Sequence, residues 1–339
     1  MLNYVLAIAT LAISASAIAP ANAAVRFTSA PPAFDRQINS TGQSPFLQAA
    51  KHKSLYVADS LNSVVYVYDL NSNQHSPPPS YTISNGISYP QGITTDKHGN
   101  LYVTNEGNNT VTVYAPGGRA PIFTIPNLLT PTDVKVDGFG DVYVSNDPGF
   151  GSQSSVVEFP PGSTTPSAEW YTLQGNQAII GIALANPNLR GTTTAFASAY
   201  TVNPSGNYTG SVLVCLTGAP NNNCDPVSTP PLGHTVGIAI ERSPTATKPM
   251  TFLLVDQYIP GIDVFGDGKL TRQVSTGGTP EYIALNSTRS NIFVSQETAN
   301  PHVDELSWPD GKLVNQFWPS GEAEYVEAGV AVSPAGTYF

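Results

Sequence analysis

The side chains best suited to contact a ligand lie in two long segments of the chain, residues 146–155 and 199–211. Both segments are rich in aromatic rings, amides and hydroxyl groups, and the residues we single out as a binding set are Asp147, Phe150, Tyr200, Asn203, Asn207 and Tyr208. Aromatic rings beside adaptable amides give contact area at a low entropic cost, which suits a glycan, peptide or protein ligand. The alternative is that these are long loops without a binding role.

The chain has two cysteines, Cys215 and Cys224, which are nine positions apart across a spacer rich in turn-forming residues. In an oxidising compartment this spacing predicts a local disulfide. Closing a loop of this length is worth about 2 to 3 kcal/mol in the chain-entropy model. Two cysteines without a neighbouring histidine offer too few ligands for a metal site.

Motifs of enzymatic chemistry are missing from the sequence. It contains no Gly-x-Ser-x-Gly elbow, no His-Glu-x-x-His helix and no phosphate-binding loop. One recurring feature could hold a cation, because a polar residue follows most second strands of the repeat described next: Asp59, Asn105, Asn146, Asp256 and Gln296. We favour the alternative that these side chains hydrogen-bond the backbone of nearby turns.

All of these residues belong to a repeat that is clearest at residues 92–114. It reads Gly-Ile-Thr-Thr-Asp-Lys-His-Gly-Asn-Leu-Tyr-Val-Thr-Asn and is followed by Thr-Val-Thr-Val-Tyr. Short alternating strands and fixed turns that recur about every 45 residues predict an all-β fold, a β-propeller. In such a fold the loops after second strands lie at the entrance of the central channel, and both long segments are loops of this kind.

The number of blades depends on how the last repeat is completed. The first strands of successive repeats are expected at residues 46–50, 92–96, 133–137, 181–185, 237–241, 282–286 and 329–333. The seventh start is followed by six residues only, so we expect N-terminal residues 25–44 to complete a last blade closed by strands from both termini. Seven blades are favoured; six is the alternative, if the last strand adds to an existing sheet.

Composition and charge constrain the compartment and the partners. Residues 1–23 carry no charge and combine an apolar run with Ala21-Asn22-Ala23, which predicts a secretory signal peptide followed by a single domain over residues 24–339. We therefore expect an exported protein, periplasmic or extracellular, and a monomer without a membrane span. The net charge of −10 argues against nucleic acid as a partner.

The repeat at residues 92–114 resembles the NHL repeat, and the resemblance extends over most of the chain. NHL-like propellers are usually binding platforms, and their relatives include calcium-dependent lactonases of the gluconolactonase and regucalcin type and the streptogramin lyases. In the lactonases a metal is held just before first strands. The matching positions here are Gln91, Thr132, Ile180, Val236, Glu281 and Ala328.

These positions make a poor metal cage, because a hard cation needs several convergent oxygen ligands. Glu281 and Gln91 are the candidates for a Ca²⁺ or other divalent ion. The streptogramin lyases rely on His and Glu near the channel, and here His234 could meet Glu281 as a general-base pair. We expect no cofactor and a binding platform without catalysis of its own; the alternative is a metal-dependent hydrolase or lyase.

Overall fold

The computed structural model describes residues 53–72, 74–149, 151–185, 193–216, 222–242, 250–259, 261–319 and 329–333. The predicted signal peptide, residues 25–44 and the predicted strand at 46–50 lie outside these ranges, as does Phe150. Among the described residues no helix is long and apolar enough to cross a membrane.

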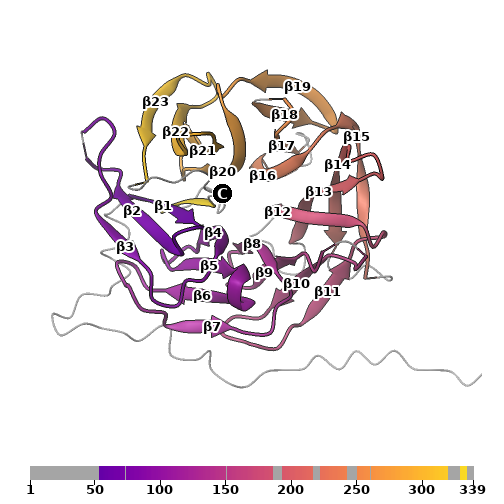
Figure 1. The fold of residues 1–339 in the computed structure, drawn as a ribbon, viewed down its shortest axis with the longest axis horizontal. Coiled ribbons are helices and arrows are strands. Elements are labelled where there is room, and N and C mark those ends of the chain that lie inside the picture. Colours follow the sequence, from indigo (N-terminus) through magenta and orange to yellow (C-terminus); the bar gives the residue numbers. More distant parts are fainter. Residues whose placement is uncertain are drawn as a thin grey trace, which may run out of the picture.

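Six four-stranded antiparallel sheets radiate from a common centre as the blades of a propeller (Figure 1). Blade one contains β24 (Val330–Ser333), β1 (Ser54–Asp59), β2 (Val64–Asp69) and β3 (Tyr81–Ile83). Blade two contains β4 (Pro90–Thr95), β5 (Leu101–Asn105), β6 (Thr110–Tyr114) and β7 (Phe123–Ile125). Blade three contains β8 (Pro131–Val136), β9 (Val142–Asn146), β10 (Ser155–Phe159) and β11 (Ala168–Tyr171). A short 3-10 helix, Glu106–Asn108, follows β5.

Blades four to six continue the pattern, with the innermost strand first in each. Blade four contains β12 (Gln177–Ala185), β13 (Thr194–Val202), β14 (Tyr208–Leu216) and β15 (Cys224–Leu232). Blade five contains β16 (Thr235–Arg242), β17 (Thr251–Asp256), β18 (Ile262–Gly266) and β19 (Lys269–Val274). Blade six contains β20 (Thr279–Leu285), β21 (Asn291–Glu297), β22 (His302–Ser307) and β23 (Leu313–Phe317). The first strands expected at residues 92–96, 133–137, 181–185, 237–241 and 282–286 correspond to β4, β8, β12, β16 and β20.

The prediction of seven blades is wrong, because the propeller has six. The C-terminal strand β24 does not begin another sheet; it pairs with β1, with Leu55 opposite Val332, and becomes the innermost strand of blade one. In Figure 1 this yellow strand lies beside the indigo β1. The stated alternative, a last strand that adds to an existing sheet, is what closes the ring. This pairing covers the inner edge of β1, so no further half-sheet needs a partner.

The core lies between neighbouring blades. Second and third strands alternate Val, Tyr and Phe, residues that favour strands, and both faces of these strands are buried because a blade stands on either side. At the junction of blades one and six, for example, the rings of Tyr68 and Phe317 pack edge to face with centroids 5.3 Å apart. Blade packing therefore fixes where each strand end points.

Glycine at the start of the inner strands allows neighbouring blades to approach around the channel. A Cβ atom on Gly181 would lie 2.6 Å from the carbonyl oxygen of Val236 in the next blade. Gly237 is crowded in the same way by the backbone of Glu281. Any larger residue would push the inner strands apart, which explains why Gly-Ile or Gly-Val recurs in the sequence.

Blade four departs from the others. Its four strands each have nine residues, whereas those of blade two have between three and six. The predicted disulfide is present: Cys215 in β14 is bonded to Cys224, its cross-strand partner in β15. Because β13 and β14 each have nine residues, the hairpin that they form is longer than its counterpart in blade two, and it carries Tyr200 and Tyr208 on its two strands.

Candidate functional site

Strand direction divides the loops between two faces of the propeller. Loops that enter a first strand or join a second strand to a third lie on one face, which we call the channel-mouth face. Turns that join first to second strands or third to fourth strands lie on the opposite face, which we call the far face. Residues with similar roles in the repeat therefore gather on the same face.

A cavity of about 310 Å³ opens at the centre of the channel-mouth face. Its lining includes the predicted channel positions of blades two to six: Gln91, Thr132, Ile180, Val236 and Glu281. Ala328, the remaining predicted position, lies outside the described residues. The rest of the lining is Glu106, Thr130, Asp147, Tyr200, His234, Gln257, Tyr282 and Glu297. Three residues singled out from the sequence, Asp147, Tyr200 and His234, are thus brought together with Glu281 and Gln91.

The cavity is acidic. Its lining contains the carboxylates of Glu106, Asp147, Glu281 and Glu297, and among the described lining residues there is no Lys or Arg. Two glutamine amides donate to three of these carboxylates: Gln91 Nε2 to Glu106 Oε2 at 2.9 Å, and Gln257 Nε2 to Glu281 Oε1 and Glu297 Oε2, each at 3.2 Å. An amide satisfies carboxylate lone pairs without cancelling charge, so the site favours ligands that are cationic or rich in donors.

Four rings form one side of the site, and we call them the aromatic wall: Tyr200, Tyr208, His234 and Tyr258. The His234 ring lies 4.4 Å from Tyr200 and 4.2 Å from Tyr208, measured between centroids, and Tyr208 lies 5.8 Å from Tyr258. Tyr258 is 56% exposed, so the wall extends from the cavity to the surface. Such rings can pack against a sugar ring, an aliphatic chain or a cation.

His234 is held in place mainly through its backbone and its neighbours. Asp256 accepts hydrogen bonds from the backbone N–H groups of Gly233 (2.7 Å), His234 (3.1 Å) and Tyr258 (3.0 Å). Burial lowers the pKa of the His234 imidazole below its usual range, although a hydrogen bond with Gln257 and the charge of Asp256 act in the opposite direction. The neutral imidazole is therefore the form favoured at neutral pH.

The polar residues that follow second strands mostly fix loops, as favoured from the sequence. Asn105 Oδ1 accepts from the backbone N–H of Ser88 at 3.0 Å, and Asn146 Oδ1 accepts from that of Leu129 at 3.2 Å. Asp256 does the same for the loop of His234. Their side chains turn into the blade, which leaves the next residue along the chain to face the cavity.

Other members of the predicted binding set lie apart from the cavity lining. Asn203 and Asn207 are exposed in the turn of the β13–β14 hairpin, where Asn203 Oδ1 accepts from the backbone N–H groups of Ser205 and Asn207 at 2.9 Å each. Asn203 therefore shapes the turn.

Asp147, in contrast, lines the cavity. Burial raises the pKa of its carboxyl, and hydrogen bonds from Gly149 and Ser154 act in the opposite direction.

The sequence reasoning missed Glu106, Gln257 and Glu297. Each directly follows the recurring polar residue of its blade, as Asp147 and Tyr200 follow Asn146 and Ala199. Side chains alternate direction along a strand, so this position points to the channel mouth when its predecessor points into the blade. The sequence feature that could have identified these residues is their position: directly after the repeated polar residue, the residue type differs from blade to blade.

The lactonase-type metal site is not reproduced by these residues. Of the matched positions, Ile180 and Val236 have no donor atom, Thr132 has a hydroxyl, and Glu281 has the sole carboxylate. Among the described residues no group of three or more His, Cys, Asp or Glu side chains is placed to hold a metal ion. The donor set therefore does not fit the metal that the lactonase resemblance implies.

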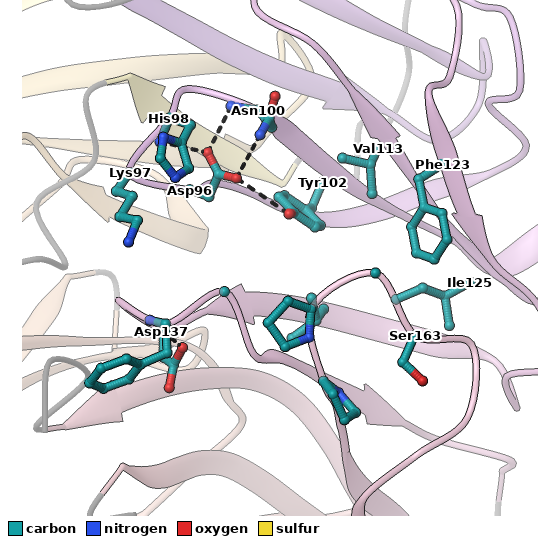
Figure 2. A pocket seen from close by; sticks show the side chains of 16 residues that line it. Asp96, Lys97, His98, Asn100, Tyr102, Val113, Phe123, Ile125, Asp137 and Ser163 are labelled. Atoms are coloured by element: carbon teal, nitrogen blue, oxygen red, sulfur yellow. Dashed lines mark hydrogen bonds between the residues drawn. The ribbon is translucent and has the colours of Figure 1, made fainter. Parts of the chain in front are cut away.

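A second pocket, of about 150 Å³, lies between blades two and three on the far face (Figure 2). Its carboxylates serve their own turns. Asp96, which Figure 2 shows directed at its turn, accepts from the backbone N–H groups of His98 and Asn100, from Asn100 Nδ2 and from the Tyr102 hydroxyl, at 2.8 to 3.3 Å. Asp137 accepts from the N–H groups of Phe139 and Asp141. We therefore place the candidate site at the channel mouth.

Comparisons with known proteins agree with the propeller fold. Residues 47–147 match the family model described as the SMP-30/gluconolactonase/LRE-like region. No curated protein gives a significant match. The chain is thus a six-bladed propeller with a distant likeness to lactonase-type propellers.

Solved structures resemble the chain at low sequence identity. The crystal structure of a nidogen/laminin complex aligns with 83% of this chain and 98% of its own, with 14% identity and a TM-score of 0.60. A functionally unknown protein from Desulfotomaculum acetoxidans aligns with 82% of this chain and 98% of its own, with 14% identity and a TM-score of 0.54. A luciferin-regenerating enzyme aligns with 68% of this chain and 76% of its own, with 12% identity and a TM-score of 0.48. The first two likenesses, at 14% identity, show a shared fold alone.

Proposed function

We propose that this protein is an exported β-propeller that acts as a binding platform and holds its ligand at the channel mouth. The observation that carries the proposal is the meeting of the aromatic wall with four carboxylates around one open cavity. Concave sites with rigid rings and a few oriented polar groups are typical of ligand binding. The fold is compatible with this role, since a similar propeller occurs in the nidogen/laminin complex.

Export is supported by two independent features. The uncharged N-terminal segment, residues 1–23, has the composition of a secretory signal peptide. The disulfide between Cys215 and Cys224 is of the kind that persists in oxidising compartments. We infer that the mature protein begins at Ala24 and works in a periplasm or outside the cell. N-terminal sequencing of the protein recovered from the periplasmic fraction and from the culture medium tests whether the mature chain begins at Ala24.

The binding site is tested with ligand-observed NMR on a panel of monosaccharides and capped amino acids. Wild-type protein is compared with the double variant Tyr200→Ala/Tyr208→Ala. Phe139→Ala, which removes a ring from the far-face pocket, is the matched control. We expect compounds that bind the wild type and Phe139→Ala to lose at least about 10-fold in affinity for the double variant. Equal binding to all three proteins would place the site elsewhere.

A second candidate is acid–base chemistry at the same cavity. It is favoured by one observation: Gln257 connects the side chains of His234 and Glu281, and His234 is held in the neutral form that can accept a proton. This candidate predicts turnover of lactones or related cyclic esters that is lost in both His234→Gln and Glu281→Gln. The assay is run with EDTA and with added Ca²⁺ in parallel. Turnover that is unchanged in both variants would rule it out.

A further inference from the structure

Basic side chains are distributed unevenly between the two faces. Among the described residues, Lys and Arg lie at the far-face ends of strands or in far-face turns: Lys53, Lys97, Arg119, Lys135, Arg242, Lys269, Arg289 and Lys312. Arg272, in the outer strand β19, lies over the ring of Trp308, which follows β22 on the far face. In the described part of the chain, no loop of the channel-mouth face contains a Lys or an Arg.

Among the described residues, carboxylates occur on both faces, but only on the far face do they lie among Lys and Arg residues, as Asp69, Asp96 and Asp267 do. Glu106, Asp147, Glu281 and Glu297 line the cavity, and Asp59 and Asp256 end the second strands of blades one and five on the channel-mouth face. Two histidines also lie there. Burial keeps His234 in its neutral form, and His302 is paired with Asp304 at 3.3 Å, which balances its charge. Within the described ranges, the channel-mouth face therefore has a negative field that no Lys or Arg on the same face offsets.

Exposed apolar side chains also lie in the loops of this same face. They come from the loops of different blades: Leu61, Leu129, Leu173, Tyr258, Ile259 and Trp318. The other large exposed apolar residues lie in or beside outer strands: Ile122, Tyr171, Leu270, Leu313 and Val314. Exposed apolar side chains on several loops of one face indicate a surface that contacts another protein rather than a free metabolite.

From these observations we infer that the channel-mouth face docks a protein, and that the partner inserts a Lys or Arg side chain into the acidic cavity while apolar residues beside it cover the rim. The inference rests on the proposed binding function and names the class of ligand. A cavity of about 310 Å³ is large enough for a long basic side chain. Its alkyl part would pack on the aromatic wall, and its charged end would meet the carboxylates.

A free small-molecule amine could also place a positive charge in the cavity, but it lacks the apolar residues that flank a Lys or Arg in a protein. Binding experiments can therefore distinguish a protein partner from a free amine. The rim residues add nothing to the binding of a small cation, whereas a protein segment would bury several of them at once. The partner's basic side chain is expected to act as the central anchor, because hot spots cluster near the centre of an interface and Arg is among the residue types enriched there.

Selection from a random peptide display library on the immobilised mature protein tests the inference. We expect the enriched peptides to carry a Lys or Arg flanked by apolar residues. One enriched peptide is then synthesised together with its counterpart in which norleucine replaces the basic residue. The peptide should bind at least about 10-fold more tightly than the norleucine counterpart and than N-acetyl-lysine methylamide, and its affinity should fall as NaCl is raised.

Matched variants locate the binding. Glu297→Gln removes one negative charge at the cavity, and Asp310→Asn removes one in an exposed turn of the far face. We expect Glu297→Gln to weaken the basic peptide at least about fivefold and Asp310→Asn to have less than a twofold effect. Equal effects, enrichment of peptides without a basic residue, or no enrichment at all would overturn the inference. If a neutral ligand still binds and depends on Tyr200 and Tyr208, the binding platform stands and the basic partner fails.

Discussion

Carboxylates occur in both pockets of the propeller, but they do different work in each. In the far-face pocket, Asp96 and Asp137 belong to the repeated Asp-x-x-Gly turn, and each accepts several hydrogen bonds from its own turn. At the channel mouth, Glu281 and Glu297 stand at positions that change from blade to blade, and they share a single amide donor, Gln257. Repeated polar residues build the blade, and the residues beside them are free to build a site.

The largest effect expected from this difference is on stability. Asp96 is 6% exposed and accepts four hydrogen bonds, so Asp96→Ala leaves buried donors without a partner and should lower the free energy of unfolding by about 2 to 4 kcal/mol. Glu281→Gln keeps an acceptor for Gln257 and should cost less than about 1 kcal/mol. Urea denaturation of both variants measures this. A larger loss for Glu281→Gln would reverse the assignment of roles.

Removing the disulfide should have the next largest effect. The variant Cys215→Ser/Cys224→Ser frees a loop of ten residues, and the chain-entropy model gives a loss of about 2 to 3 kcal/mol. Binding of a channel-mouth ligand should change less than twofold, because Cys215 lies near the far-face end of β14 and Tyr208 begins that strand. Wild-type protein under a reductant is the control. A large loss of affinity would mean that the two ends of blade four are coupled.

A smaller stability effect, with a clear effect on binding, is expected at the aromatic wall. Tyr208 is half-buried and contacts the rings of Tyr200, His234 and Tyr258. Tyr208→Ala should cost about 1 kcal/mol of stability and about 10-fold in affinity for the displayed basic peptide, whereas Tyr208→Phe should keep most of both. Titration calorimetry and thermal unfolding on the same samples separate the two quantities. A variant that loses stability but binds normally would remove Tyr208 from the site.

The sequence was sufficient for features that depend on local pattern. The strands and the disulfide follow from alternation and spacing, and the channel positions Gln91 and Glu281 follow from the lactonase resemblance. The number of blades does not, because it depends on the pairing of β24 with β1 at opposite ends of the chain, and no local signal records that contact. Gln257 and Glu297 were not predicted because their position in the repeat holds a different residue in each blade, so the repeat pattern gives it no recognisable type.

The smallest effect concerns pH, and it contrasts two histidines of the channel-mouth face. The folded pKa of His234 lies below its ordinary value, so its contribution to stability is complete above about pH 6.5 and is lost as the pH falls and the unfolded chain takes up a proton. Burial alone would lower the pKa of His302, but hydrogen bonds with Asp304 and the Asn300 carbonyl raise it. Its contribution is complete below about pH 6.5 and is lost as the pH rises through the raised value.

Urea denaturation at pH 5 and pH 8 of the wild type, His234→Gln and His302→Gln measures both contributions. His234→Gln should cost less stability at pH 5 than at pH 8, because the native protein at pH 5 already carries the penalty of keeping this imidazole neutral. His302→Gln should cost more at pH 5, where the imidazolium pairs with Asp304. NMR titration of the two imidazoles provides the check on assignment. Parallel pH profiles for the two variants would show that the aromatic wall does not shelter His234 from water.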